Sequence, residues 1–206
     1  GNFLPEKSQI GVTSSGVPGS VAGLIYALEK YGTLSLAEVI QPAIDLARNG
    51  FVLEYRLARS LEYETESFNK FESSKKTFTK NGTSYIEGEI FIQNDLAYTL
   101  EQIKLKGLDG FYSGRIAQLI VNQINQQGGI ITFDDLKNYK PIERSAITSV
   151  YKGYKVITMG PPSGGGVSLL QMLNILENNS FTKNEWGSSG YIHQLIETMK
   201  YSFADR

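Results

Sequence analysis

Apolar residues recur at the spacing of an α-helix over most of the first half of the chain. Residues 17–32 predict one such helix. Its apolar face consists of Val21, Leu24, Ile25 and Leu28. Residues 35–50 predict a second helix, in which Ser35 and Glu38 stand at the positions of a capping box. Pro42 falls inside this helix, and we expect it to kink the helix or to divide it into two pieces.

The apolar face of the second helix consists of Leu36, Val39, Ile40, Ala43, Ile44 and Ala47. A more polar helix is expected over residues 53–71, followed by a small β-excursion over residues 76–91 with a turn at Asn81–Gly82. Residues 94–107 and 115–129 return to helical spacing. We interpret these segments as packing helices.

The pattern changes near Ile130. Thr132 and Asp135 predict a short capped helix over residues 132–139. Residues 144–159 then alternate between apolar and polar on both sides of Lys152–Gly153, which predicts an antiparallel hairpin.

The segment MGPPSGGGVSLLQMLNILE, residues 159–177, combines a glycine-rich turn with a helix that is apolar on nearly every face. Such a helix is expected to be buried. The turn lacks the lysine of a phosphate-binding loop and the glycine spacing of a dinucleotide-binding loop. Ser163 is not in a nucleophile-elbow motif, so it either caps the helix or contacts a ligand, and we favour the cap.

The last helix includes the single histidine of the chain, His193. Its expected apolar face consists of Ile192, Leu195, Ile196, Met199 and Phe203. His193 lies at the edge of this face, which is typical of a structural or solvated side chain. The sequence stops at Arg206 without a glycine or another helix breaker, and we interpret this as a cut through or just after a helix.

Composition narrows the classes of function. The chain has 206 residues, 41% of them hydrophobic, which suits one large domain or part of a larger one. Its 20 basic and 21 acidic residues nearly balance, so the composition predicts no basic surface that would bind nucleic acid. It has no cysteine, which excludes disulfides and thiolate metal ligands, and the pattern shows no membrane span and no signal sequence in GNFLPEKSQ. Adjacent acids such as Asp134–Asp135 are typical of caps and solvated helix faces.

Five segments together resemble the large subunit of γ-glutamyltranspeptidases in order and spacing. They are residues 14–51, 93–121, 128–156, 160–177 and 193–206. The resemblance extends from about Gly11 to Arg206. It implies an N-terminal-nucleophile hydrolase made as one precursor that cuts itself into a large and a small subunit.

The resemblance also implies the fold and the chemistry. We expect an α/β (α+β) chain, mostly helical with a β-hairpin, forming part of an αββα sandwich. Residues 1–206 are expected to be a single partial domain, with a helical part over about 17–128 and a hairpin with C-terminal helices over about 130–206. In the family the N-terminal threonine of the small subunit attacks a γ-glutamyl amide such as glutathione. Its own amine can act as the base, so no cofactor or metal is implied.

No catalytic residue of the family corresponds to a position in this chain. The nucleophile and the oxyanion hole belong beyond Arg206, and the arginine that binds the α-carboxylate belongs to a motif upstream of Gly1. None of the arginines present stands in that motif: Arg48, Arg56, Arg59, Arg115 and Arg144. The family loop Pro-Pro-Pro-Ser-Ser-Gly-Gly is altered here, with Gly160 at the first proline and Gly164 at the second serine. Ser163 and Gly164 are the candidates for contact with substrate.

The sequence therefore supports a γ-glutamyltransferase or γ-glutamyl hydrolase fragment that is inactive alone. Its expected partners are the rest of its precursor, including the small subunit, and glutathione or another γ-glutamyl compound. A periplasmic or secreted location is implied by the family. Two alternatives stay open: a fragment of a poly-γ-glutamate-degrading relative, and a non-catalytic module that binds a partner or itself. Apolar surface is then expected on residues 146–158 and 167–176.

Overall fold

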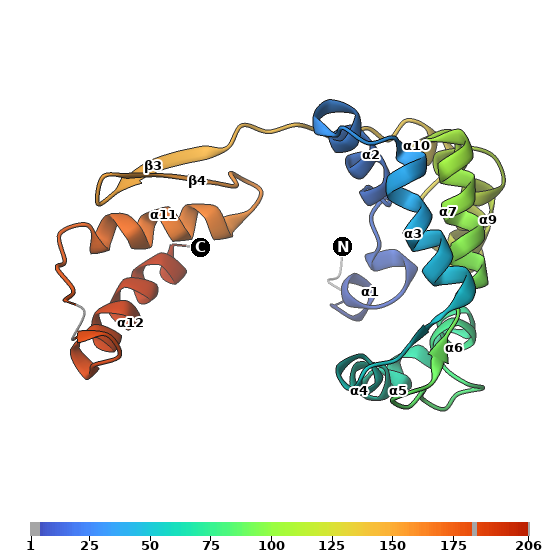
Figure 1. The fold of residues 1–206 in the computed structure, drawn as a ribbon, viewed down its shortest axis with the longest axis horizontal. Helices are drawn as coiled ribbons and strands as arrows, with labels where there is room; N and C mark the ends of the chain where they lie inside the picture. The colour runs from blue at the N-terminus through green and yellow to red at the C-terminus, as the bar shows by residue number, and fades with distance from the viewer. Residues whose placement is uncertain (1–4, 183–184, 206) are drawn as a thin grey trace. The chain divides into compact units, whose positions relative to one another are not determined.

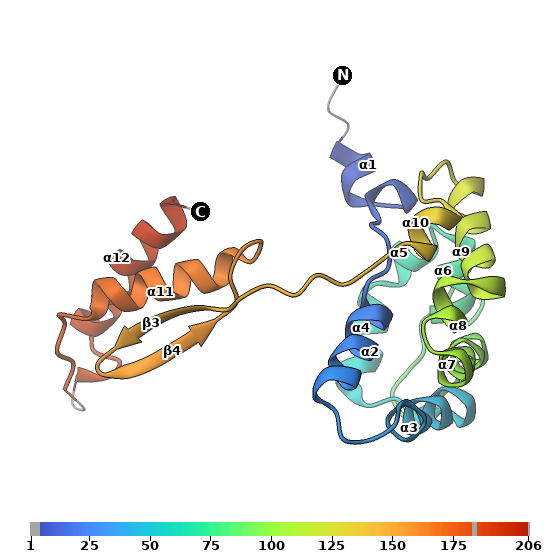
Figure 2. The same cartoon turned by 90° about the horizontal axis from the view of Figure 1, so that it is seen from above.

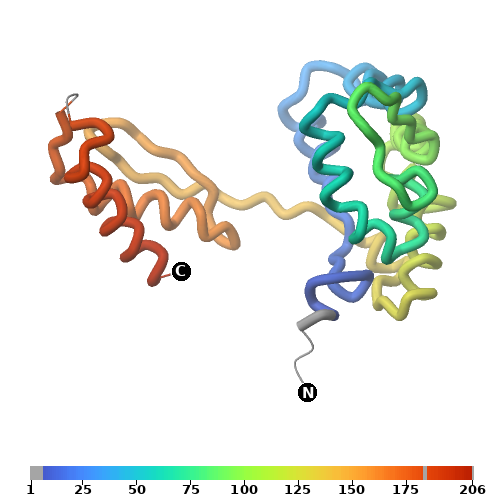
Figure 3. The backbone as a smooth tube through the Cα atoms, turned by 90° about the horizontal axis from the view of Figure 1, so that it is seen from below, coloured from blue at the N-terminus to red at the C-terminus, as the bar shows by residue number. Residues whose placement is uncertain are grey.

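The computed structural model describes residues 5–182 and 185–205, in which helices dominate and two small antiparallel sheets occur (Figure 1). The first four residues of GNFLPEKSQ and Arg206 lie outside the described residues. The predicted α+β class is confirmed. The chain forms two compact units, Gly1–Pro141 and Ile142–Arg206. Figure 3 follows the backbone of the first unit from blue to yellow and that of the second in orange and red.

The first unit contains most of the helices and one small sheet. Its elements are α1 (Pro5–Gln9), the 3-10 helix η1 (Val12–Ser14), α2 (Ser20–Tyr31), α3 (Leu36–Asn49), β1 (Phe51–Val52), α4 (Tyr55–Tyr63), α5 (Thr65–Phe68), α6 (Glu72–Phe78), β2 (Ile90–Phe91), α7 (Asn94–Lys106), α8 (Asp109–Tyr112), α9 (Gly114–Gln126) and α10 (Phe133–Lys137). The second unit contains β3 (Ile147–Tyr151), β4 (Tyr154–Thr158), α11 (Gly164–Leu176) and α12 (Ser189–Ala204).

Two capping boxes predicted from the sequence are confirmed. The Ser35 hydroxyl accepts from the Glu38 N–H at 3.3 Å, and the Glu38 carboxylate accepts from the Ser35 N–H at 2.8 Å. Thr132 and Asp135 repeat the arrangement at the start of α10, with distances of 3.2 and 2.8 Å. The Ser35 hydroxyl also donates to the Glu38 carboxylate at 2.6 Å, and the Thr132 hydroxyl donates to that of Asp135 at 2.7 Å. These hydroxyl bonds, together with the backbone N–H bonds, favour the charged carboxylates and lower the pKa of Glu38 and of Asp135.

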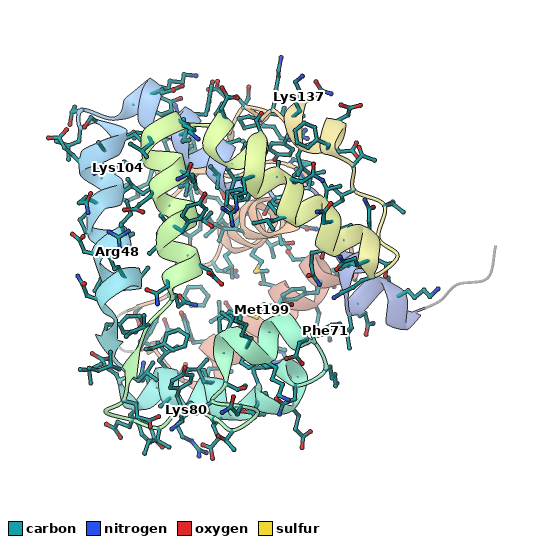
Figure 4. All side chains as sticks on the ribbon, turned by 90° about the vertical axis from the view of Figure 1, so that its right-hand side faces the viewer. Arg48, Phe71, Lys80, Lys104, Lys137 and Met199 are labelled. Atoms are coloured by element: carbon teal, nitrogen blue, oxygen red, sulfur yellow. The ribbon has the colours of Figure 1, made fainter. Side chains whose placement is uncertain are left out.

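Helix α3 runs unbroken through Pro42, so the alternative of two short pieces is wrong. The helix packs along α7, and polar contacts join the two on both sides of the proline. Arg48 forms an ion pair with Glu101, and the Lys104 ammonium donates to the Gln41 side-chain carbonyl at 2.5 Å (Figure 4). Tertiary packing therefore outweighs the helix-breaking tendency of Pro42.

The main core of the first unit is centred on Tyr112. The buried residues of this core are Ala22, Tyr112, Ala117, Val121, Ile124, Ile131 and Leu136. The Tyr112 hydroxyl accepts from the Ala22 N–H at 3.1 Å and donates to the Pro18 carbonyl at 2.6 Å. Burial raises the pKa of Tyr112, so its hydroxyl stays protonated and keeps donating. This one side chain joins the start of α2 to the rest of the core.

A smaller aromatic cluster surrounds the β1–β2 pair. Phe51 pairs with Phe91 in the antiparallel register, and Leu53 is completely buried beside them. The predicted β-excursion is wrong in part, because its first residues end helix α6 and only a Lys80–Thr83 bridge forms around the turn. The pairing of β1 with β2 joins segments far apart in the sequence, which local periodicity does not predict. The predicted helix over residues 53–71 is two helices, α4 and α5.

In the second unit, α11 lies between the hairpin and α12 (Figure 1). The hairpin prediction is confirmed, since β3 and β4 pair antiparallel. Lys152 and Gly153 form its turn with φ of 49° and 82°. The Glu177 carboxylate at the end of α11 accepts from the Lys152 N–H, and the Ser149 hydroxyl donates to the Asn174 side chain at 3.2 Å. The hairpin is thus fixed to the C-terminal half of α11.

In the second unit, the helix faces that are buried differ from those that the sequence predicts. Helix α11 is not buried all round, because Val167 and Leu169 are 46% and 43% exposed. On α12 the predicted apolar face is largely exposed, including Ile196 at 50%. Thr198 and Ser202 are buried instead, at 3% and 1% exposure. Small side chains allow a close approach to α11, and the periodicity of α12 alone does not identify this neighbouring face.

Candidate functional site

The glycine-rich loop connects the end of β4 to the start of α11. The Ser163 N–H donates to the Gly160 carbonyl at 3.2 Å, which closes a turn, and the Pro161–Pro162 peptide is cis. A side chain at Gly166 would place its Cβ atom 1.9 Å from the Met159 carbonyl oxygen. Only glycine therefore lets the first turn of α11 lie so close to the strand end. The glycine-rich turn therefore brings the start of α11 tight against the end of β4.

Ser163 occupies the N-cap position of α11 with extended backbone angles, but its hydroxyl accepts no capping hydrogen bond. The prediction that Ser163 caps the helix therefore holds for its position and is wrong for its side chain. Its hydroxyl lies in the wall of a cavity instead.

This cavity has a volume of about 240 Å³ and lies between the loop, α11 and the end of α12. It is lined by Pro161, Pro162, Ser163, Gly164, Val167, Ser168, Gln171, Ser202 and Asp205. The Gln171 amide donates to the Asp205 carboxylate at 2.5 Å, and the buried Ser202 hydroxyl donates to the Ser168 carbonyl at 3.3 Å. Both predicted residues, Ser163 and Gly164, thus line one small cavity whose wall contains both apolar and polar side chains.

The cavity wall offers hydroxyl, amide and carboxylate groups, which can hydrogen-bond a small polar ligand. A serine nucleophile needs an adjacent base, and the Asp205 carboxylate is already bonded to Gln171. His193 does not line the cavity, and its side chain is exposed on α12. The arrangement is therefore that of a binding surface and not of a nucleophile–base pair. Contact of Ser163 and Gly164 with substrate stays a prediction.

The sequence reasoning did not identify the other polar residues of the cavity. Gly164, Ser168 and Gln171 are spaced by four and three residues, so they share one face of α11. The sequence contains this spacing, but the apolar residues between these positions dominate the pattern, which predicts only a buried helix. Ser202 and Asp205 come from α12, and only the packing of the two helices brings them here.

Residues 5–182 and 185–205 contain neither a metal-binding cluster of acidic, histidine or cysteine side chains nor a membrane-spanning helix. No cluster of three or more His, Cys, Asp or Glu side chains in these ranges is arranged to hold a metal ion. No helix within them has both the length and the apolar character needed to cross a bilayer.

Comparison with known proteins gives a consistent result. Residues 2–206 match the family model described as Gamma-glutamyltranspeptidase. The chain is 44% identical over 207 residues to the glutathione hydrolase proenzyme of Escherichia coli strain K12, covering 100% of this chain and 36% of that relative. It is 36% identical to the acylase ACY 1 proenzyme of Pseudomonas sp. strain SE83, over 98% of this chain and 36% of that protein.

Solved structures agree with these matches. The crystal structure of Helicobacter pylori γ-glutamyltranspeptidase superposes with a TM-score of 0.95 at 45% identity, covering 100% of this chain and 59% of that one. The Bacillus anthracis transpeptidase enzyme CapD superposes with a TM-score of 0.81 at 35% identity, covering 93% of this chain and 65% of that one. This chain therefore spans only part of the length of the proteins it matches.

Proposed function

The chain belongs to the γ-glutamyltranspeptidase family, and we propose that it forms the central part of the large subunit of an enzyme that cleaves γ-glutamyl amides. The γ-glutamyl group would pass to water, or to an amino acid or peptide. Glutathione is the proposed substrate, because the Escherichia coli relative is described as a glutathione hydrolase proenzyme.

The observation that carries the proposal is the match of the whole chain to proenzymes of which it spans 36%. The cavity at Ser163 contains no nucleophile–base pair. What the family resemblance implies is a nucleophile outside this chain, the N-terminal threonine of the small subunit. Its amine would serve as the base. We therefore propose that residues 1–206 alone are inactive and that the rest of the precursor is their partner.

We further propose that the Ser163–Gly164 loop contacts substrate in the complete enzyme. The Ser163 hydroxyl makes no capping hydrogen bond, so it can donate to a ligand. The tight contact at Gly166 fixes the loop against the end of β4, which limits the movement of Ser163. Gly164 adds no side chain, so a ligand can approach the backbone closely there.

The test starts with the gene on both sides of these residues. The complete precursor and the 206-residue chain are expressed separately, and turnover of γ-glutamyl-p-nitroanilide is measured. The precursor is expected to cut itself and turn over this compound, and the chain alone is expected to show none. Measurable turnover by the chain alone would refute its proposed inactivity, whereas an inactive, uncut precursor would refute the enzyme assignment.

The assay also tests which acyl group the complete enzyme removes. The same residues match an acylase at 36% identity, so the assay should include a non-glutamyl amide as a competing substrate. Poly-γ-glutamate is included as well, because a polymer-degrading relative is the alternative left open by the family resemblance. Preference for poly-γ-glutamate over glutathione would support the alternative of a polymer-degrading enzyme.

A non-catalytic module remains a second candidate because apolar side chains are exposed on the hairpin. Val150 and Ile157 are 60% and 62% exposed, and Met159 beyond the hairpin is 68% exposed. Such a surface favours association. A stop codon directly after Arg206, together with a stable oligomer in light scattering, would support this candidate over the enzyme.

A further inference from the structure

Helices α2, α3 and α7 belong to the first unit (Figure 2). A large apolar groove lies between α2 and the packed pair α3–α7. Its volume is about 620 Å³. It is lined by Val21, Leu24, Ile25, Ala27, Leu28, Tyr31, Gly32, Leu36, Val39, Ile40, Ala43, Leu100 and Ile103. No charged residue lines this groove, whereas the charged residue Asp205 lines the cavity at Ser163.

The groove joins two helix faces whose sequence pattern predicts burial. The α2 face contributes all four residues of its predicted apolar stripe, and α3 contributes Leu36, Val39, Ile40 and Ala43. Ile25 and Ile103 are buried, at 6% and 4% exposure. Leu24 and Tyr31 are 71% and 69% exposed in the same wall. The helices are therefore patterned for a contact that the described residues of the first unit do not supply.

The chemistry of the wall narrows the occupant. Small-molecule sites combine an apolar wall with a few convergent polar groups, and this lining contributes only one polar side-chain group, the Tyr31 hydroxyl. A cavity of about 150 Å³ holds one benzene-sized ring, so the groove has room for roughly four such side chains. Apolar residues at positions i, i+3 or i+4, and i+7 of a helix would fill it.

Two polypeptide occupants are compared: another segment of the same precursor, and a second copy of this chain. The length of the relatives favours the first. This chain spans 36% of the Escherichia coli proenzyme and 59% of the Helicobacter pylori chain, so further polypeptide folds with the equivalent residues there. We propose that the α2–α3–α7 groove receives an apolar helix face from the rest of the same precursor. The proposal rests on the proposed function, because it needs a precursor that extends beyond these residues.

The test uses Leu24→Glu with Leu105→Glu as a matched control. Leu105 lies on α7, is 73% exposed and does not line the groove, so the two leucines are equally exposed in this structure. Each substitution is made in the 206-residue chain and in the complete precursor, and the midpoint of thermal unfolding is measured. In the chain, both substitutions are expected to shift the midpoint by less than about 2 °C. In the precursor, Leu24→Glu alone is expected to lower it by about 4 °C or more, because it places a charge in an occupied apolar groove.

The other outcomes overturn the proposal. An unchanged midpoint for Leu24→Glu in the precursor would show that the groove stays open, and an equal loss for Leu105→Glu would show that the effect is not specific to the groove. A dimer of the isolated chain that Leu24→Glu converts to a monomer would make a second copy the occupant. This experiment measures unfolding and not turnover, so it tests the groove separately from the proposed function. A precursor without activity that Leu24→Glu still destabilises would refute the proposed function and support the groove assignment.

Discussion

Replacing Gly166 by alanine is expected to destabilise the second unit, and the structure gives the size of the effect. The added Cβ would lie 1.9 Å from the Met159 carbonyl oxygen and 2.9 Å from the Thr158 hydroxyl, whereas ordinary contacts begin at 3.4 Å. The first turn of α11 must therefore move away from the end of β4 by about 1.5 Å. The closest group, the Met159 carbonyl, belongs to the backbone, so it cannot rotate away as a flexible side chain could.

Two opposing free energies set the expected magnitude. Overpacking of this kind costs about 1–3 kcal/mol, and the severity of the overlap places Gly166→Ala near the upper end. Alanine gains about 0.5–1 kcal/mol over glycine within a helix. The net loss of unfolding free energy is then about 2 kcal/mol, which raises the unfolded fraction by roughly 30-fold.

Gly165→Ala is the matched control. Its added Cβ would meet only the Ser163 hydroxyl at 3.6 Å, so the helix gain is unopposed and stability should stay equal or rise by up to about 1 kcal/mol. Both variants are unfolded in urea and followed by far-UV circular dichroism and by fluorescence of Trp186, the single tryptophan, which lies in the second unit. Equal stability of the two variants, or a more stable Gly166→Ala, would refute the close-approach argument.

Two further predictions concern the first unit. Tyr112→Phe removes the bonds to Ala22 and Pro18 and leaves a buried N–H and a carbonyl unpaired, so urea denaturation is expected to show a loss of about 1–3 kcal/mol. The pKa of Glu38 is lowered from 4.5 by its bonds to Ser35, so this stabilisation is present above pH 4.5 and is lost as the pH falls through the lowered value. Glu38→Gln keeps an acceptor for the Ser35 N–H but does not titrate, so its unfolding free energy should fall less steeply below pH 4.5 than that of the unchanged chain.

The sequence predicted those elements whose signals are local. The Ser35–Glu38 box and the Lys152–Gly153 turn depend on residues within a few positions of one another, and both form as expected. The β1–β2 pair was missed because it depends on contacts between Phe51 and Phe91, distant in the sequence. Local rules also left two outcomes open at Pro42, where packing against α7 keeps the helix continuous.

The candidate site was only partly predictable for the same reason. Ser163 and Gly164 could be named from the glycine-rich loop, but the loop pattern does not specify what lies opposite. Ser202 enters the cavity because α12 turns its small residues towards α11, against the face that apolar periodicity favours. A hydrophobic pattern predicts that a helix face is buried, but it does not predict which neighbouring element buries it.

This distinction also explains where pattern and burial disagree. Leu24 on α2 and Ile196 on α12 both belong to predicted apolar faces, yet they are 71% and 50% exposed. Local misassignment of helices does not account for this, because α2 and α12 form close to where the sequence predicts them. The exposed faces therefore correspond to contacts that the pattern predicts and that the described residues of each unit do not make within that unit. Under the proposed function these contacts belong to the rest of the precursor. We therefore expect the rest of the precursor to pack against these two faces.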